Sequence, residues 1–149
     1  MGREATTGNR FDRAARGFEF VDHPGDVKIR AWSTNLENLF VAAAEGMMLF
    51  LFGNGIAEVA PDRTQTLEIE AKDREALLVE WLSELLYRAT CEYRAYMGFR
   101  IHELTERKLK ATVATAAAEA VEDIKAVTYH ELSLRECECR WEASIVFDT

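Results

Sequence analysis

The residues best placed to do chemistry are acidic side chains near the two ends of the chain. Asp26 follows the corner Asp22–Gly25, and Asp148 precedes Thr149. The proline of this corner fixes its own φ, and the glycine tolerates backbone angles that other residues avoid. The corner is therefore rigid, and it delivers Asp26 to the start of a strand. A carboxylate there is either a turn cap, which is an ordinary role for Asp, or a ligand.

The carboxyl end of the chain carries two more anionic groups, the side chain of Asp148 and the terminal carboxylate of Thr149. Alternating apolar residues up to Phe147 predict a strand that ties this end into a sheet. Lys125, near the start of another expected strand, is a candidate counter-charge, although a solvated lysine is the commoner alternative. A frayed chain end would leave these groups without a shared role.

Two further sets of residues have ligand atoms but less specific spacing. His130, Cys137 and Cys139 outline a zinc site, but the gap between the cysteines is not the usual two residues and a fourth ligand is missing. Two small thiols on one face of a strand explain this pattern better. Glu80 and Glu84 lie one helical turn apart, which is typical of a solvated helix face. No serine lies in a glycine-flanked elbow, and no glycine-rich phosphate loop follows a strand.

The composition indicates one ordinary globular domain. The chain has 149 residues, of which 48% are hydrophobic and 30% charged, and a formal net charge of −8. This charge argues against direct nucleic-acid binding and favours a basic partner or a cation. No apolar run has the length of a membrane span, and no signal peptide is evident. The odd cysteine count favours reduced thiols, so we expect a cytoplasmic protein without a membrane anchor.

Hydrophobic periodicity predicts the order ββαβα followed by about four strands. Residues 1–16 show no period and are expected to be a flexible tail, which leaves residues 17–149 as a single domain. Thr34 with Glu37 has capping-box spacing before the first helix, and Asp73 is the expected cap of the second. Gly53-Asn54-Gly55 is expected to end the first helix. The predicted class is α+β, with both helices packed on a mostly antiparallel sheet.

The two expected helices supply the core against that one sheet. The residues expected to be buried there are Leu36, Phe40, Met47, Leu78, Trp81 and Leu85. Cys91, near the end of the second helix, is expected to be a small buried hydrophobe. Residues 114–121 lack large apolar residues at regular spacing and are interpreted as a loop. Residues 124–134 alternate and are expected to form a strand.

Several segments of the chain resemble the archease family, in the family's order, over about residues 17–149. The stretch from Asp22 to Ala31 resembles its acidic-His-Thr-Ala-Asp-Val and Gly-Ile-Arg-Ala signature. Both expected helices resemble the family's helices, and the ending Val146-Phe147-Asp148 closes the pattern. The most specific match is the block Ile-Lys-Ala-Val-Thr-Tyr-His at residues 124–130. The departures are Pro24, Gly25, Ser83 and Thr149, in place of Thr, Ala, Asn, and Ile or Val.

This resemblance implies a non-catalytic accessory protein of the tRNA-splicing RNA ligase. That ligase joins ends bearing a 2′,3′-cyclic phosphate or a 3′-phosphate, and archease promotes its guanylylation and multiple turnover. The resemblance also implies a metal site, described with calcium, at Asp26, Asp148 and Thr149. It makes Lys125 a functional candidate beside Asp26 and Asp148 in activating the ligase. Because calcium takes about six to eight oxygen ligands, water or the partner would complete its shell.

Two other functions stay open at this point. A small metal-dependent hydrolase or nuclease could use the cluster of Asp26 and Asp148, and it would process RNA without a partner protein. A chaperone-like binder of unfolded chains would instead expose a broad apolar patch. The sequence does not distinguish tRNA splicing from RNA repair.

Overall fold

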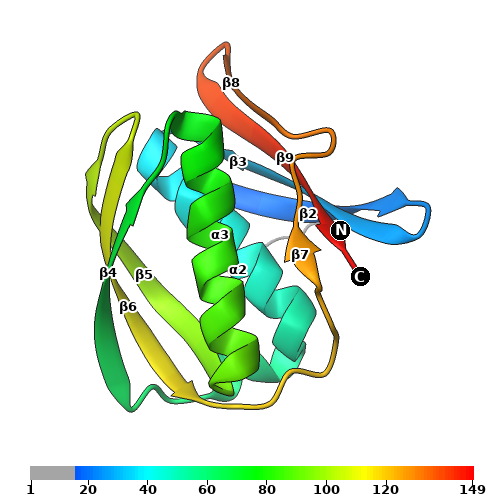
Figure 1. Ribbon diagram of the computed structural model, residues 1–149, viewed down its shortest axis with the longest axis vertical. Coiled ribbons are helices and arrows are strands. Elements are labelled where there is room, and N and C mark those ends of the chain that lie inside the picture. Colours follow the sequence, from blue (N-terminus) through cyan, green and yellow to red (C-terminus); the bar gives the residue numbers. More distant parts are fainter. Residues whose placement is uncertain (1–15) are drawn as a thin grey trace.

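Two antiparallel sheets pack against two helices in the computed structural model, which describes residues 16–149 (Figure 1). The first sheet contains β2 (Arg16–His23), β3 (Asp26–Ser33), β9 (Arg140–Asp148) and β7 (Ala126–Val127) in that order, and β8 (Ser133–Cys137) also pairs with β9. The second sheet contains β4 (Arg63–Glu70), β6 (Lys108–Ala117) and β5 (Arg94–Leu104) in that order. The expected α+β class is confirmed, but the strands divide between two sheets rather than one. The expected tail lies outside the described residues except for Arg16, which begins β2.

Helix α2 (Leu36–Phe52) begins one residue later than predicted. The side chain of Asn35 accepts a hydrogen bond from the backbone N–H of Asn38 at 2.8 Å, so Asn35 is the cap and the assignment to Thr34 is wrong. The amide oxygen of Asn35 satisfies a first-turn N–H that has no partner within the helix. The helix ends at Gly53, with φ at 75°, as predicted, and the short 3-10 helix η1 (Asn54–Glu58) follows.

Helix α3 (Arg74–Cys91) is capped by Asp73, whose side chain accepts from the Ala76 N–H at 2.8 Å, as predicted. The indole N–H of Trp81 donates to the carbonyl oxygen of Phe40 at 3.0 Å and joins the two helices. The predicted burial of Cys91 is wrong, because the last turn of α3 reaches the surface and leaves this residue exposed.

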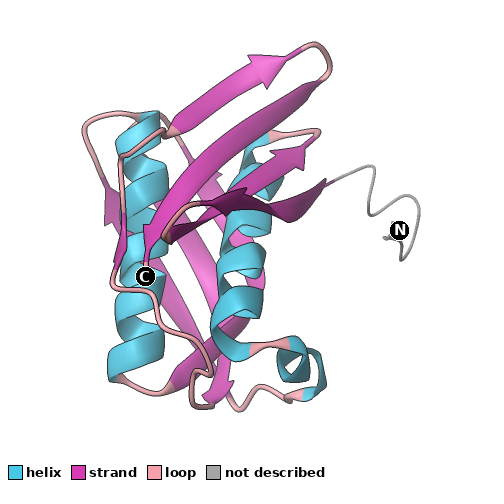
Figure 2. Ribbon diagram, turned by 90° about the vertical axis from the view of Figure 1, so that its right-hand side faces the viewer, coloured by secondary structure: helices cyan, strands magenta, loops and turns pink. Residues whose placement is uncertain are grey.

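The core lies where the helices meet both sheets, and Figures 1 and 2 show the helices upright beside the strands. Helix α2 packs on β2, β3 and β9 of the first sheet and on β5 of the second. Helix α3 packs on β4, β5 and β6, and on β7. Of the predicted core residues, Phe40, Met47, Leu78, Trp81 and Leu85 are buried. Leu36 is only half-buried because it begins its helix. No helix among the described residues is long and apolar enough to cross a membrane.

Two expectations for the second half of the chain are wrong. Residues 114–117, expected to be a loop, continue β6, because strands on both sides of β6 pair with its backbone there. Residues 124–134, expected to be one strand, form only the short β7 before the turn 128–132, and β8 follows. Thr128 holds this turn on the first sheet, since its backbone N–H and its hydroxyl both donate to the Val146 carbonyl, at 3.1 and 2.9 Å.

Candidate functional site

Three polar residues lie side by side where the strands of the first sheet end. In the strand register, His23 is opposite Asp26, and Asp26 is opposite Asp148. Residues directly opposite one another in antiparallel strands carry their side chains on the same face. We call His23, Asp26 and Asp148 the strand-end row. The two aspartates therefore converge as expected, although β3 and β9 come from opposite ends of the described chain.

The tight turn between β2 and β3 delivers Asp26 to this row. Gly25 has φ at 78°, a left-handed conformation that glycine adopts without steric cost. The Asp26 carboxylate accepts no hydrogen bond from any residue between 16 and 149, so it does not cap the turn. Its one ionic neighbour in that range is Nδ1 of His23, 3.8 Å from Oδ2. Of the two roles expected for Asp26, the turn cap is therefore not formed.

The other predicted site residues reach the same end of the sheet. The backbone N–H of Lys125 donates to the Asp148 carbonyl at 2.7 Å, and the hydroxyl of Thr149 donates to the Gly25 carbonyl at 3.5 Å. Figure 1 shows the carboxyl terminus beside β7. The Lys125 side chain is exposed and forms no ion pair with the described part of the chain. The backbone of Lys125 therefore lies beside Asp148, and its side chain is not committed to an ion pair with residues 16–149.

The strand-end row places two negative charges next to each other. Like charges directly opposite each other in a strand pair destabilise the pairing, and Asp26 and Asp148 have this arrangement. Two carboxylates, with the Gly25 carbonyl and the Thr149 hydroxyl at the same end of the sheet, are oxygen groups of the kind that a hard cation such as Ca²⁺ takes as ligands. A divalent ion here would replace repulsion between the carboxylates with attraction.

A second cluster of polar side chains, which the sequence did not predict, lies over the same face of the sheet. Glu131 is 3.4 Å from Nε2 of His23, 3.3 Å from Nε2 of His130 and 3.1 Å from Nζ of Lys28. The hydrogen bond from Lys28 lowers the pKa of Glu131, and the adjacent His23 ring lowers it to a smaller extent. We call His23, His130 and Glu131 the imidazole cluster. Glu131 gave no signal in the sequence because its partners meet it only when the turn 128–132 folds onto the sheet.

The weaker ligand sets considered in the sequence do not form. Cys137 ends β8 and Cys139 lies in the next turn. The prediction that the two cysteines share one face of a strand is therefore wrong. The imidazole cluster is the one group of three metal-ligating side chains that comes together within the described residues. Glu84 pairs with Arg88 at 2.6 Å, which agrees with a solvated helix face.

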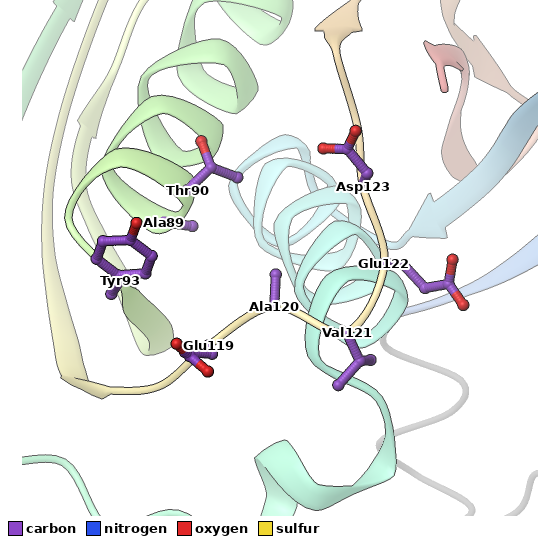
Figure 3. Close-up of a pocket in the computed structure, with 8 residues that line it drawn as sticks. All are labelled: Ala89, Thr90, Tyr93, Glu119, Ala120, Val121, Glu122 and Asp123. Carbon is purple, nitrogen blue, oxygen red and sulfur yellow. The ribbon is translucent and has the colours of Figure 1, made fainter.

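A surface depression of about 560 Å³ lies at the end of α3 (Figure 3). Its polar lining comes from Thr90, Tyr93, Glu119, Glu122 and Asp123. The lining contains no histidine, cysteine or lysine that could activate a nucleophile. None of it belongs to the strand-end row or the imidazole cluster, so the depression does not provide a substrate cleft for either.

Comparison with known proteins shows that this chain is similar to the members of one family. Residues 18–149 match the model of the Archease protein family (MTH1598/TM1083). Protein archease of Methanosarcina acetivorans is 31% identical over 140 residues, which cover 88% of this chain and 94% of that protein. Protein archease of Thermococcus kodakarensis is 32% identical over 142 residues, which cover 89% and 99%.

Two solved structures are similar in fold. The solution structure of protein 1598 from Methanobacterium thermoautotrophicum has a TM-score of 0.72 at 26% identity, covering 89% of this chain and 99% of that one. A crystal structure from Thermotoga maritima, described as an archease and possible chaperone, has a TM-score of 0.64 at 20% identity. It covers 87% of this chain and 94% of that one. At this identity the second structure supports the fold alone.

Proposed function

Since the chain belongs to the archease family, we propose that it is a non-catalytic activator of the tRNA-splicing RNA ligase. The ligase joins RNA ends that bear a 2′,3′-cyclic phosphate or a 3′-phosphate. In this proposal the protein promotes guanylylation of the ligase and allows each ligase molecule to complete many rounds. It forms and breaks no RNA bond itself.

One observation supports this proposal most strongly. Asp26 and Asp148 face each other at an open sheet end, with Lys125 hydrogen-bonded alongside through its backbone. Two facing carboxylates cost stability, and they contribute no core packing in return. An arrangement that opposes stability and lies at the surface is best explained by binding.

The charges of the row suggest how it would act. With a net charge of −8, the protein would be attracted to a positively lined nucleotide-binding centre, and added salt would weaken this attraction. A calcium ion held by Asp26, Asp148 and a Thr149 oxygen would supply a positive charge at the contact. The Lys125 ammonium would pair with an anionic group of the partner. In this way the two aspartates, with Thr149 and Lys125, would position ligase groups for guanylyl transfer from GTP.

The test measures ligase guanylylation and ligated product per ligase molecule in the presence of each variant. Asp26→Asn, Asp148→Asn and Lys125→Ala should each keep the fold and reduce product to about a single round. Asp123→Asn and Lys110→Ala are matched controls outside the row and should stimulate as the wild type does. If Asp26→Asn, Asp148→Asn and Lys125→Ala all stimulate as fully as the wild type, the proposed activating surface is wrong.

The hydrolase alternative is tested in the same experiment. Incubating RNA with the protein alone and a divalent ion should leave the RNA intact. Cleavage that Asp148→Asn abolishes would replace the activator proposal with a metal-dependent nuclease.

The general chaperone alternative has less support. Exposed large apolar side chains in the described residues lie on β2, on α3 and in three separate loops, rather than on one element. These residues are Phe20, Tyr87, Tyr93, Val121 and Tyr129. The description of the Thermotoga maritima protein as a possible chaperone is compatible with help given to one specific partner.

A further inference from the structure

We propose that the imidazole cluster binds a first-row transition metal of the zinc type, at a site distinct from the hard-cation site proposed at Asp26, Asp148 and Thr149. One ligand atom from each of His23, His130 and Glu131 lies within 4.8 Å of the others. The ligands come from two segments, the end of β2 and the turn 128–132. The fold of the turn onto the sheet therefore assembles the site.

The distances suit a metal better than hydrogen bonds. Glu131 Oε1 is 3.4 Å from Nε2 of His23, and Oε2 is 3.3 Å from Nε2 of His130. An N–H···O hydrogen bond usually spans about 2.7–3.2 Å, so both pairs are slightly too long. In a tetrahedral site with metal–ligand bonds of about 2.0–2.1 Å, neighbouring ligand atoms are about 3.3–3.4 Å apart. Each imidazole thus lies at this spacing from one oxygen of the Glu131 carboxylate, and small side-chain movements would bring all three groups to one ion.

The second nitrogen of His23 supports the same assignment. Nδ1 is buried and has no hydrogen-bond partner, and the nearest carboxylate oxygen, Oδ2 of Asp26, is 3.8 Å away. A histidine that binds metal through one nitrogen almost always donates its other N–H to a carboxylate, a carbonyl or water. A metal on Nε2 would fix the tautomer with hydrogen on Nδ1, directed at Asp26. Asp26 would then orient the metal ligand His23 while it also faces Asp148.

The backbone and charge at Glu131 fit a ligand as well. Glu131 has φ at +54°, a left-handed conformation that is uncommon outside glycine and that costs free energy. Nζ of Lys28 also lies 3.1 Å from the Glu131 carboxylate. Because a carboxylate offers about four lone-pair positions, Lys28 and a metal can bind it together. Two imidazoles select a zinc-type ion over calcium. Three protein ligands leave a fourth position for water or for a partner's side chain.

The proposal is tested with Co²⁺, whose visible absorption reports tetrahedral coordination. Cys91, Cys137 and Cys139 are first blocked with iodoacetamide, so that thiols do not bind the probe. Excess Ca²⁺ is present to saturate any hard-cation site. Wild-type protein should bind one equivalent of Co²⁺ with tetrahedral absorption, and Zn²⁺ should displace it.

Variants then identify the ligands. His130→Ala and Glu131→Gln should each weaken Co²⁺ binding by more than the roughly 10–100-fold expected for loss of an outer-shell partner. His102→Ala is the matched control, because His102 is the one histidine of the sequence outside the cluster. It lies on β5 and is hydrogen-bonded to the Thr112 hydroxyl. Asp148→Asn should also retain Co²⁺ binding. Circular dichroism confirms that each variant is folded.

Two results would overturn the proposal. Wild-type protein that binds no Co²⁺ under these conditions would show that the cluster is an ion-pair network anchoring the turn 128–132. Folded His130→Ala and Glu131→Gln that bind Co²⁺ as the wild type does would place the metal elsewhere. Because no ligase is present, neither result depends on the proposed activation of the ligase.

Discussion

At the scale of single residues, burial changes abruptly at the end of β9. Phe147 is fully buried, whereas the next residue, Asp148, is exposed. The register places Phe147 opposite Val27 and Asp148 opposite Asp26. Apolar pairs thus hold the strand end in position, and the polar pair is presented to solvent. Substitution of Asp148 should therefore affect binding far more than packing.

Tyr96 provides a prediction about pH. Burial, with a smaller contribution from nearby Glu92, raises the pKa of Tyr96 above the ordinary value of 10.0. The folded state favours the neutral phenol, so its contribution to stability is complete below pH 10 and is lost as pH rises through the raised pKa. Urea unfolding between about pH 8 and pH 11 should show this loss in the wild type and less of it in Tyr96→Phe.

The control for this experiment is Tyr87→Phe, because Tyr87 is 59% exposed. This variant should lose stability with pH as the wild type does. Equal pH profiles for Tyr96→Phe and wild type would contradict the assignment.

At the scale of elements, the two helices hold both sheets together through one shared core. The Trp81 indole bonds to the Phe40 carbonyl, and its ring meets Phe99 of β5 at 5.9 Å between centroids. On α2, Gly46 allows close approach to the first sheet, since a Cβ there would lie 2.0 Å from Cδ1 of Ile29. Contacts made by a few positions on each helix therefore position the strands that carry the site.

Leu85 tests this packing. It is fully buried on α3, so Leu85→Ala should lower the free energy of unfolding by about 2–5 kcal/mol, through lost burial and the cavity left behind. Leu36→Ala is the matched comparison and should cost less, because Leu36 is only half-buried. Urea unfolding measures both. A cost for Leu36→Ala as large as for Leu85→Ala would contradict the described core.

At the scale of the whole molecule, an ion at the proposed hard-cation site would connect strands that are far apart in the sequence. Asp26 comes from the second described strand and Asp148 from the last, so an ion between them would link segments from both ends of the chain. An ion that binds only the folded state stabilises it by mass action. Without the ion, the repulsion between the two carboxylates is uncompensated.

This coupling predicts how calcium affects stability. Ca²⁺ at 100 times its dissociation constant should raise the free energy of unfolding of the wild type by about 2.7 kcal/mol. Asp148→Asn should lose this increment, and without Ca²⁺ it should be at least as stable as the wild type. Asp123→Asn, an exposed control, should retain the increment. Thermal or urea unfolding with and without Ca²⁺ measures the effect, and an equal gain in Asp148→Asn would exclude the site.

The sequence by itself determined the features that depend on near neighbours. Asp73 caps α3 because its side chain reaches an N–H three residues away, and Gly53 ends α2 because glycine accepts a positive φ. Periodic apolar residues identified both helices, the α+β class and most of the core. Turn chemistry, strand alternation and charge pointed to Asp26, Lys125, Asp148 and Thr149 as candidates, and the family resemblance implied their roles.

Only the tertiary structure decided the features that depend on distant segments. The division into two sheets follows from which strand edges pair, and residues 114–117 became strand because β4 and β5 flank them. The turn at Glu131 and its neighbours His23 and Lys28 meet because Thr128 bonds to β9. Local patterns carry no information about such contacts, since the free energy that selects them comes from pairing and burial between residues far apart in the chain.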